Sequence, residues 1–132
     1  CTAGLVADLL AQVPGASRVL WGSFVSYTVT AKIKMLGLEK ALIERYGAVS
    51  QETACAMARA AMERSAADMA VSVTGLAGPD GDGTSAPVGT VWIGTLLRGK
   101  EPTSRRFHYT GSRNEVRSAA AADAIRELLA QV

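Results

Sequence analysis

The sequence predicts a single α/β domain with a layered α/β/α arrangement around a mixed β-sheet. Three observations lead to this prediction. Segments with the apolar spacing of helices alternate with short runs rich in β-branched residues, which is the pattern of layered α/β proteins. The length of 132 residues and the apolar content of 48% suit one hydrophobic core. No long Pro, Ser or charged tract divides the chain, so we expect one domain over residues 1–132.

The first third of the chain predicts a helix, a strand and a second helix. Residues 2–12 carry apolar and small residues at helical spacing, with Thr2 as the expected N-cap. Residues 17–28 are rich in β-branched and aromatic residues and predict a strand. Residues 30–36 return to helix, and Gly37 suits the position that ends it.

The middle of the chain predicts two helices followed by a buried strand. A short helix is expected over residues 38–45 and a longer one over residues 51–65, capped by the hydroxyl of Ser50. The Ala and Met residues of the longer helix are typical of a helix packed on a sheet rather than of a cofactor site. Residues 69–74 form an apolar run of the kind found in buried parallel strands.

The last third predicts a β-hairpin and a long helix. Residues 88–97 and 103–109 have strand composition and flank a turn over residues 98–101, so at least one strand pair should be antiparallel. Ser112 and Glu115 fit a capping box at the start of the final helix. One face of that helix carries apolar residues at a spacing of four, namely Val116, Ala120, Ala124, Leu128 and Val132.

Composition argues against several classes of function. The formal charge of +2 arises from 14 basic and 12 acidic residues spread along the chain, so no basic stripe for a nucleic-acid partner is present. No apolar run is long enough to span a bilayer, and the start of the chain lacks a signal-peptide pattern. Cys1 and Cys55 belong to no metal-binding or redox motif. We therefore expect a cytoplasmic protein with no membrane partner and no metal site.

Tyr27 and Lys32 form the first candidate site. They lie five positions apart, where the expected strand meets the next helix. Ligands in α/β proteins usually bind at the ends of strands, which makes this junction a candidate binding position. From the residues alone, the alternative for Lys32 is a solvated helix lysine like Lys34.

A Gly-rich loop over residues 74–87 forms the second candidate site. Its glycines permit several backbone amides to point at one anion; the alternative is a flexible surface connection. Arg113 and Arg117 lie one turn apart on the final helix and can hold a phosphate or carboxylate, unless they belong to a solvated face. His108 has no partner visible in the sequence, so a packing or surface role is the default.

Three blocks of sequence stand out as a set. They are Cys-Thr-Ala-Gly-Leu-Val-Ala at residues 1–7, the segment 27–37, and Val-Thr-Gly-Leu-Ala-Gly-Pro-Asp-Gly at residues 73–81 followed by Pro-Val-Gly-Thr-Val. Residues 46–50 and 111–117 add to them. In this order and spacing the blocks resemble the CinA C-terminal domain family, also known as the PncC nicotinamide-nucleotide amidases. The resemblance extends over essentially the whole chain.

The resemblance implies an amidase that hydrolyses the carboxamide of nicotinamide mononucleotide to nicotinate mononucleotide and ammonia, without a cofactor. It implies a Ser-Tyr-Lys type site, with Lys32 as the base and Tyr27 relaying a proton or donating to the oxyanion. The nucleophilic Ser is expected just before Cys1. The residues expected to bind the substrate are Thr2, Gly4, Thr74, Gly75, Gly78, Pro79 and Arg113.

The resemblance also implies a homodimer, and it implies that the chain lacks the N-terminal helix and first strand of the family domain. Two departures from the family pattern stand near the expected site. Ala3 replaces the first Gly of a Glu-Ser-Cys-Thr-Gly-Gly block, and Val29 replaces the Asn of Tyr-Ser-Asn. Two alternatives to the enzyme stay open: a catalytically silent scaffold of the same fold, and a module that senses a pyridine nucleotide without converting it.

Overall fold

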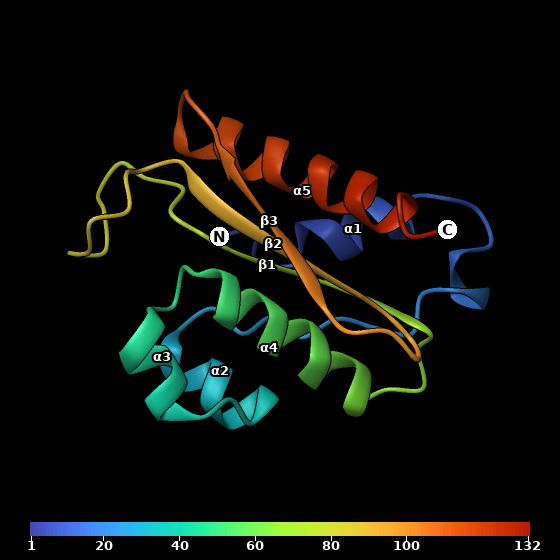
Figure 1. Ribbon diagram of the computed structural model, residues 1–132. Helices are drawn as coiled ribbons and strands as arrows, with labels where there is room; N and C mark the ends of the chain where they lie inside the picture. Colours follow the sequence, from blue (N-terminus) through green and yellow to red (C-terminus); the bar gives the residue numbers. More distant parts are fainter.

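The computed structural model describes residues 1–132 and shows one α/β domain, as the sequence predicts (Figure 1). It contains five α-helices, one short 3-10 helix and a three-stranded sheet. In chain order the elements are α1 (Leu5–Ala11), η1 (Ala16–Arg18), α2 (Val29–Leu36), α3 (Lys40–Tyr46), α4 (Gln51–Glu63), β1 (Met69–Gly75), β2 (Thr90–Leu97), β3 (Thr103–His108) and α5 (Arg113–Leu129).

The sheet is antiparallel throughout, with the strand order β1-β2-β3. β1 pairs with β2 from Met69 opposite Leu97 to Gly75 opposite Val91. The turn between β2 and β3 forms the predicted hairpin. The expectation of a mixed sheet is therefore wrong for these three strands. The apolar character of β1 comes from helices on both faces of the sheet, and that burial does not require a parallel neighbour.

Helices cover both faces of the sheet (Figure 1), which confirms the layered arrangement. On one face, α5 buries Val116 and Ala120 against Val91 and Ile93 of β2, and α1 packs on α5. On the other face, α4 approaches so closely that a side chain at Gly94 would lie 2.6 Å from the Ala54 oxygen. The small residues of α4 therefore set the distance between helix and sheet.

Three helix ends follow the predicted caps, at Ser50, Gly37 and Ser112. The Ser50 hydroxyl accepts a hydrogen bond from the third backbone N–H of α4, and Thr28, an N-cap that was not predicted, does the same for α2. Gly37 ends α2 with a left-handed backbone at φ 70°. Ser112 and Glu115 form a complete capping box at the start of α5, because each side chain bonds the other's backbone N–H. These short-range signals are read correctly from sequence since each involves groups within four residues of one another.

The structure corrects two predictions in the first third of the chain. Thr2 is not the N-cap of α1; Gly4 occupies that position in a left-handed conformation at φ 89°, without a side-chain cap. The strand expected over residues 17–28 is replaced by the 3-10 turn η1 and then by an extended segment, residues 20–27, that belongs to no sheet. Strand composition alone does not make a strand, because a strand also needs a neighbour to accept its hydrogen bonds.

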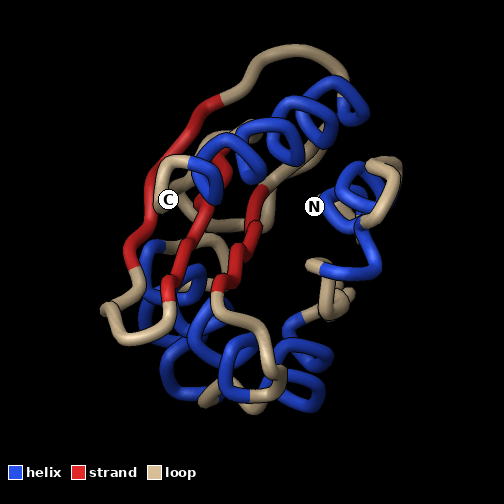
Figure 2. Tube along the Cα trace, turned by 90° about the vertical axis from the view of Figure 1, so that its right-hand side faces the viewer, coloured by secondary structure: helices blue, strands red, loops and turns tan.

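The extended segment lies apart from the sheet, on the side of β1 that faces away from β2. Figure 2 shows the three strands together and the N-terminal region as a separate wall beside them. A second apolar cluster joins α2, α3 and α4 below the sheet, with Leu36, Ile43 and Met57 at its centre and Phe24 packed against it. None of the helices combines the length and apolar character needed to cross a membrane.

Candidate functional site

Lys32 is a buried lysine. It lies on α2 and is only 7% exposed, and its Nζ donates a hydrogen bond to the Ser26 oxygen at 3.0 Å. Burial lowers the pKa of Lys32 from its usual value, because the charged ammonium loses water. No carboxylate forms a salt bridge with it. The solvated alternative is therefore excluded, and the amine can serve as an acceptor of protons more readily than a surface lysine.

Tyr27, Arg113 and Gly78 bring three distant segments together. The Arg113 guanidinium donates to the Tyr27 hydroxyl oxygen at 2.7 Å and, through its other terminal nitrogen, to the Gly78 carbonyl. Arg113 is the first residue of α5. The capping box at Ser112 fixes the start of this helix, and therefore the backbone position from which the Arg113 side chain extends. Tyr27 itself is 51% exposed, and Arg113 supplies one donor to its oxygen. The phenol hydrogen therefore remains available for another acceptor.

Arg117 holds the main chain in front of α1. Its Nε donates to the Cys1 oxygen at 3.0 Å and its Nη2 to the Thr2 oxygen at 3.1 Å, while Asn114 accepts from its remaining terminal nitrogen. The planar fork of a guanidinium suits this arrangement, because its donors point in fixed directions. Arg117 is thus a structural clamp on the first block of sequence, and it lies one turn beyond Arg113.

A small cavity of about 180 Å³ lies where these segments meet. Its lining combines Cys1 and Tyr27 with Gly75, Gly78 and Arg113, together with Leu76, Ala77 and Asp80. Cationic side chains lie around this point: Arg113 lines the cavity, and the Arg117 guanidinium contacts the Cys1 and Thr2 oxygens. Lys32 lines the adjoining larger cavity together with Cys1.

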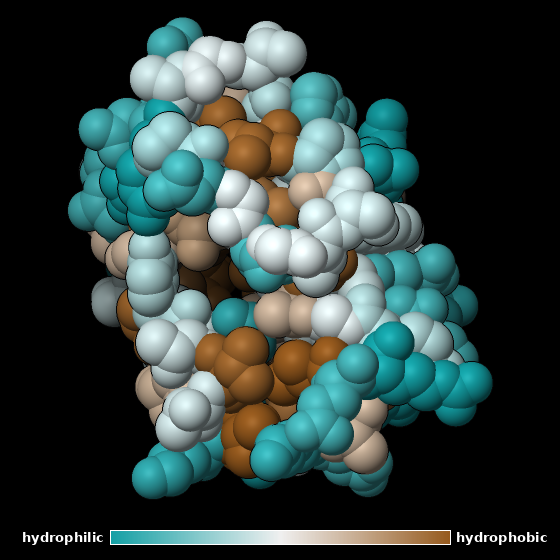
Figure 3. Space-filling view, turned by 90° about the vertical axis from the view of Figure 1, so that its left-hand side faces the viewer, coloured by the Kyte–Doolittle hydropathy of each residue, from teal (hydrophilic) through white to brown (hydrophobic).

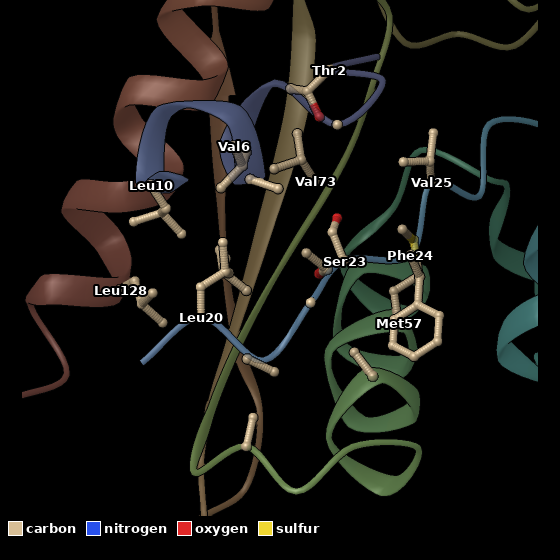
Figure 4. Close-up of a pocket in the computed structure, with 18 of the residues that line it drawn as sticks. Thr2, Val6, Leu10, Leu20, Ser23, Phe24, Val25, Met57, Val73 and Leu128 are labelled. Atoms are coloured by element: carbon tan, nitrogen blue, oxygen red, sulfur yellow. The ribbon is translucent and has the colours of Figure 1, made fainter. Parts of the chain in front are cut away.

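A larger cavity of about 1240 Å³ adjoins the small one, and Cys1, Tyr27, Gly75 and Leu76 line both. Its walls are mainly apolar. Figure 4 shows Val6, Leu10, Leu20 and Val73 lining this space, from α1, the extended segment and β1. From another side, Figure 3 shows hydrophobic residues at the bottom of a hollow bounded by more hydrophilic ones.

The structure brings only part of the predicted site together. Tyr27, Gly75, Gly78 and Arg113 line the small cavity. Lys32 lines the larger one, with Thr2, Gly4 and Thr74. Pro79 follows Gly78 in the loop, is exposed and lines neither cavity.

Thr74 and Gly78 also have structural roles. The Thr74 hydroxyl donates to the Ala48 oxygen at 2.6 Å, so it ties β1 to the segment before α4. Gly78 has φ 87°, and a side chain there would lie 2.6 Å from Val88. Such a position favours glycine both by backbone conformation and by space.

The arrangement suits an anionic or amide-bearing ligand. Arginine and lysine charges attract an anion, and the loop after β1 presents backbone groups to the same cavity. No cluster of three or more His, Cys, Asp or Glu side chains that could hold a metal is present. His108 lies outside this site, with its Nε2 3.2 Å from the Val88 oxygen.

The structural role of Arg117 is not visible in the sequence. The pair Arg113 and Arg117 was visible as two cations one turn apart at the start of a helix. Their partners are not visible in sequence, because Cys1 and Thr2 lie 116 and 115 positions away from Arg117. Only the folded chain shows that these arginines bind protein groups on three other segments.

The chain is similar to known proteins over its whole length. The family model described as "CinA C-terminal domain" matches residues 1–132. A CinA-like protein of Akkermansia muciniphila is 43% identical over 129 residues, which is 98% of this chain and 31% of that protein. A CinA-like protein of Mycobacterium marinum is 44% identical over 117 residues, 89% of this chain and 28% of that protein. The chain thus spans about a third of the length of these relatives.

Solved structures agree as well. A CinA superfamily protein from Escherichia coli superposes with a TM-score of 0.96 at 33% identity, over 100% of this chain and 76% of the other. A competence/damage inducible protein from Agrobacterium tumefaciens superposes with a TM-score of 0.94 at 40% identity, over 98% of this chain and 79% of the other. The match of the family model to the whole chain decides the assignment: the protein belongs to the CinA C-terminal domain family.

Proposed function

We propose that the protein is an amidohydrolase that converts nicotinamide mononucleotide to nicotinate mononucleotide and ammonia. The observation that carries the proposal is the buried Lys32, which lines the larger cavity together with Tyr27 and with Cys1, the residue that carries the first main-chain nitrogen of the sequence. That nitrogen is the atom to which a preceding residue is bonded. A Ser at that position, which the family resemblance implies, would lie in reach of an amine with a lowered pKa.

The reaction follows from these groups. The Ser oxygen bonds to the carboxamide carbon while neutral Lys32 takes the hydroxyl proton. The tetrahedral intermediate then loses its C–N bond, and ammonia leaves with the proton that Lys32 returns, directly or through the Tyr27 phenol. Water attacks the carbonyl carbon of the resulting ester, again giving its proton to Lys32. The second tetrahedral intermediate breaks its bond to the Ser oxygen, which takes that proton back from Lys32. The acid is released and the Ser is restored, so one water is consumed for each amide.

Tyr27 and the positive surroundings supply the remaining requirements. Because Arg113 donates to the Tyr27 oxygen, the phenol hydrogen stays free to donate to the developing oxyanion. The guanidinium of Arg113 also carries a charge that suits the phosphate of a mononucleotide. The reacting amide then lies where the two cavities meet, at Cys1 and Tyr27, and Gly78 keeps the loop close to it.

Ammonia release from nicotinamide mononucleotide tests the proposal, measured on the protein with the residues that precede Cys1. Lys32→Met should lower kcat by at least about 100-fold, the usual cost of losing a general base. Tyr27→Phe should lower kcat by about tenfold or more. Lys34 provides the matched control, since it lies on the same helix and is exposed, so Lys34→Met should leave kcat unchanged. Near-normal activity of Lys32→Met would exclude Lys32 as the general base.

A second candidate function is a pyridine-nucleotide-binding domain without catalysis. The apolar Val29, two residues from Tyr27, favours it, because this position carries a polar Asn in the pattern that the family resemblance supplies. The same assay separates the two functions. Saturable binding of the nucleotide by calorimetry without ammonia release would support the silent domain and overturn the enzyme.

A further inference from the structure

β3 is an edge strand with a row of free backbone groups. It lies at the end of the strand order β1-β2-β3, and Figure 2 shows it on the side of the sheet away from the N-terminal region. Tyr109, directly after β3, donates its N–H to the Gly89 oxygen, directly before β2. Since this direction alternates along an antiparallel strand, the N–H and C=O groups of Ser104, Arg106 and His108 point away from β2. These groups are free to pair with a further strand.

The backbone of β3 is regular enough to accept such a neighbour. The strand pairs with β2 in unbroken register from Thr103 to His108. It contains neither the bulge nor the proline that often protects an edge. Its six residues span about 20 Å at the usual rise per residue. The side chains of β3 therefore decide which strand can pair with it.

The charged side chains at this edge are mainly basic. Residues 98–108 contain four Arg and Lys residues and one Glu, a net charge of +3, whereas the whole chain carries +2. Arg105 pairs with Glu127 of α5. Arg106 is exposed and belongs to none of the five ion pairs. An arginine without a carboxylate partner therefore lies beside free backbone groups.

Ser104 adds an unmet hydrogen bond to the same strand. Its Oγ is buried and has no hydrogen-bond partner, which is uncommon for a polar group in a folded protein. Ser104 lies opposite Gly94, on the sheet face that α4 covers. A strand beside β3 would place a side chain next to Ser104, at about 4.5–5.5 Å between Cβ atoms. A hydroxyl or carboxylate at that position can accept from Ser104 after a rotation about χ1.

We propose that the β3 edge binds an extended acidic segment of a partner protein, which joins the sheet as a further strand. The backbone of the segment bonds Ser104, Arg106 and His108, as in other cases of strand addition. Its carboxylates lie beside Arg105 on one face of the sheet and beside Arg106 on the other, since side chains alternate between the faces. A hydroxyl or carboxylate of the segment also accepts from Ser104.

A second copy of this chain fits the edge poorly. Two β3 strands side by side would bring Arg105 and Arg106 of one copy next to those of the other, and like charges on opposite residues are destabilising. The same repulsion acts on any basic segment. The arginines therefore protect the edge against self-association and favour an acidic partner.

A synthetic acidic peptide, acetyl-Thr-Glu-Val-Glu-Thr-Glu-Val-amide, is the probe, added to the full-length protein. Measured by NMR, hydrogen exchange at the N–H groups of Ser104, Arg106 and His108 should slow by at least about tenfold at saturating peptide. Arg105 and Phe107 provide the reference, because their N–H groups bond β2 and are protected throughout. Unchanged exchange at the three outward N–H groups would overturn the proposal.

Two methylated peptides distinguish strand addition from simple attraction of charge. One carries N-methyl groups on its glutamates and the other carries them on its threonines and valines, so each blocks a different backbone edge of the peptide. Only one of the two should lose affinity, because the other keeps free the edge that pairs with β3. Equal affinities would show that charge alone attracts the peptide and would overturn the added strand.

A pair of variants tests the role of Arg106. Arg106→Glu reverses the charge at the edge and should weaken binding of the acidic peptide by at least about tenfold. Arg18→Glu makes the same change at an exposed arginine of η1 and should leave the affinity unchanged. Equal losses for both variants would show an effect of net charge and would contradict a site at β3.

The oligomeric alternative and the proposed amidase are tested separately. Slow exchange at the outward N–H groups without peptide, increasing with protein concentration, would assign the edge to a second copy and overturn the acidic partner. No residue of β3 lines either cavity, and none of these measurements uses ammonia release. This inference and the proposed function can therefore fail independently.

Discussion

At the scale of single residues, the candidate site depends on three cations with different tasks. Lys32 is buried and has a lowered pKa, which suits proton transfer. Arg113 joins Tyr27 to the loop carbonyl of Gly78. Arg117 holds the carbonyls that precede α1. Charge alone does not distinguish these tasks; the partners of each side chain do.

Arg117 should act as a positioning residue for the proposed reaction. Arg117→Met frees the main chain of Cys1 and Thr2, and a small displacement of a reacting group is costly. We expect kcat for ammonia release to fall by about tenfold or more with KM changed by less than about twofold. Arg117→Lys should recover little of the lost kcat, because one ammonium group cannot reproduce the directed donors of the guanidinium.

Arg126 provides the control for Arg117. It lies on the same helix and pairs with Asp123 on the surface, so Arg126→Met should leave kcat unchanged. If Arg117→Met raised KM alone, the side chain would contribute to substrate binding rather than to the placement of the first block.

The burial of Lys32 should also appear in the pH dependence of stability. Its folded pKa lies below the ordinary value of 10.5, so between the two values the unfolded chain binds more protons and stability rises with pH. Lys32→Met removes this titration. The variant should therefore be most stabilised relative to the wild type at neutral pH, and the difference should shrink toward pH 10.5.

Urea unfolding at several pH values measures this effect. Lys34→Met is the matched change at an exposed lysine of the same helix, and its difference from the wild type should not vary with pH in this way. A difference for Lys32→Met that grew as the pH rose would contradict the burial of a charged amine.

At the scale of secondary-structure elements, most helix ends and the β2–β3 hairpin agree with the prediction, whereas the N-cap at Thr2 and the strand over residues 17–28 do not. Ser50, Gly37 and the capping box at Ser112 mark helix ends correctly because their partners lie within a few residues. Residues 20–27 have the composition of a strand but no neighbouring strand in the structure. The candidate site shows the same division: the sequence places Tyr27 and Lys32 near one another, whereas the partners of Arg113 and Arg117 lie far away along the chain.

The capping box should make a measurable contribution to α5. Ser112→Ala removes the acceptor for the Glu115 N–H and should lower the free energy of unfolding by about 1 kcal/mol. Ser118→Ala, in the exposed middle of the same helix, should be neutral or slightly stabilising because alanine favours helix. Thermal or urea unfolding distinguishes the two. An equal loss for both variants would exclude capping as the cause.

At the scale of the whole molecule, apolar packing rather than ion pairing holds the layers together. The buried residues of β2, α4 and α5 form the interfaces on both faces of the sheet. Each of the five ion pairs has at least one well-exposed partner. Exposed pairs contribute little to stability and are screened by salt.

The stability of the folded chain should therefore depend only weakly on ionic strength. Raising NaCl from about 0.1 M to about 1 M should change the free energy of unfolding by less than about 1 kcal/mol. Urea unfolding at the two salt concentrations gives this value. A much larger loss at high salt would show that the surface pairs act as a network.

The hydrogen bond between Tyr27 and Arg113 affects when the candidate site can form during synthesis on the ribosome. It joins residues 86 positions apart, and α5, which carries both Arg113 and Arg117, is synthesised after the other elements of this domain. Domains emerge from their N-terminal end at about 5–20 residues per second. For several seconds the nascent chain therefore lacks Arg113 and Arg117. The contacts of these arginines in the candidate site form only when translation of the domain is complete.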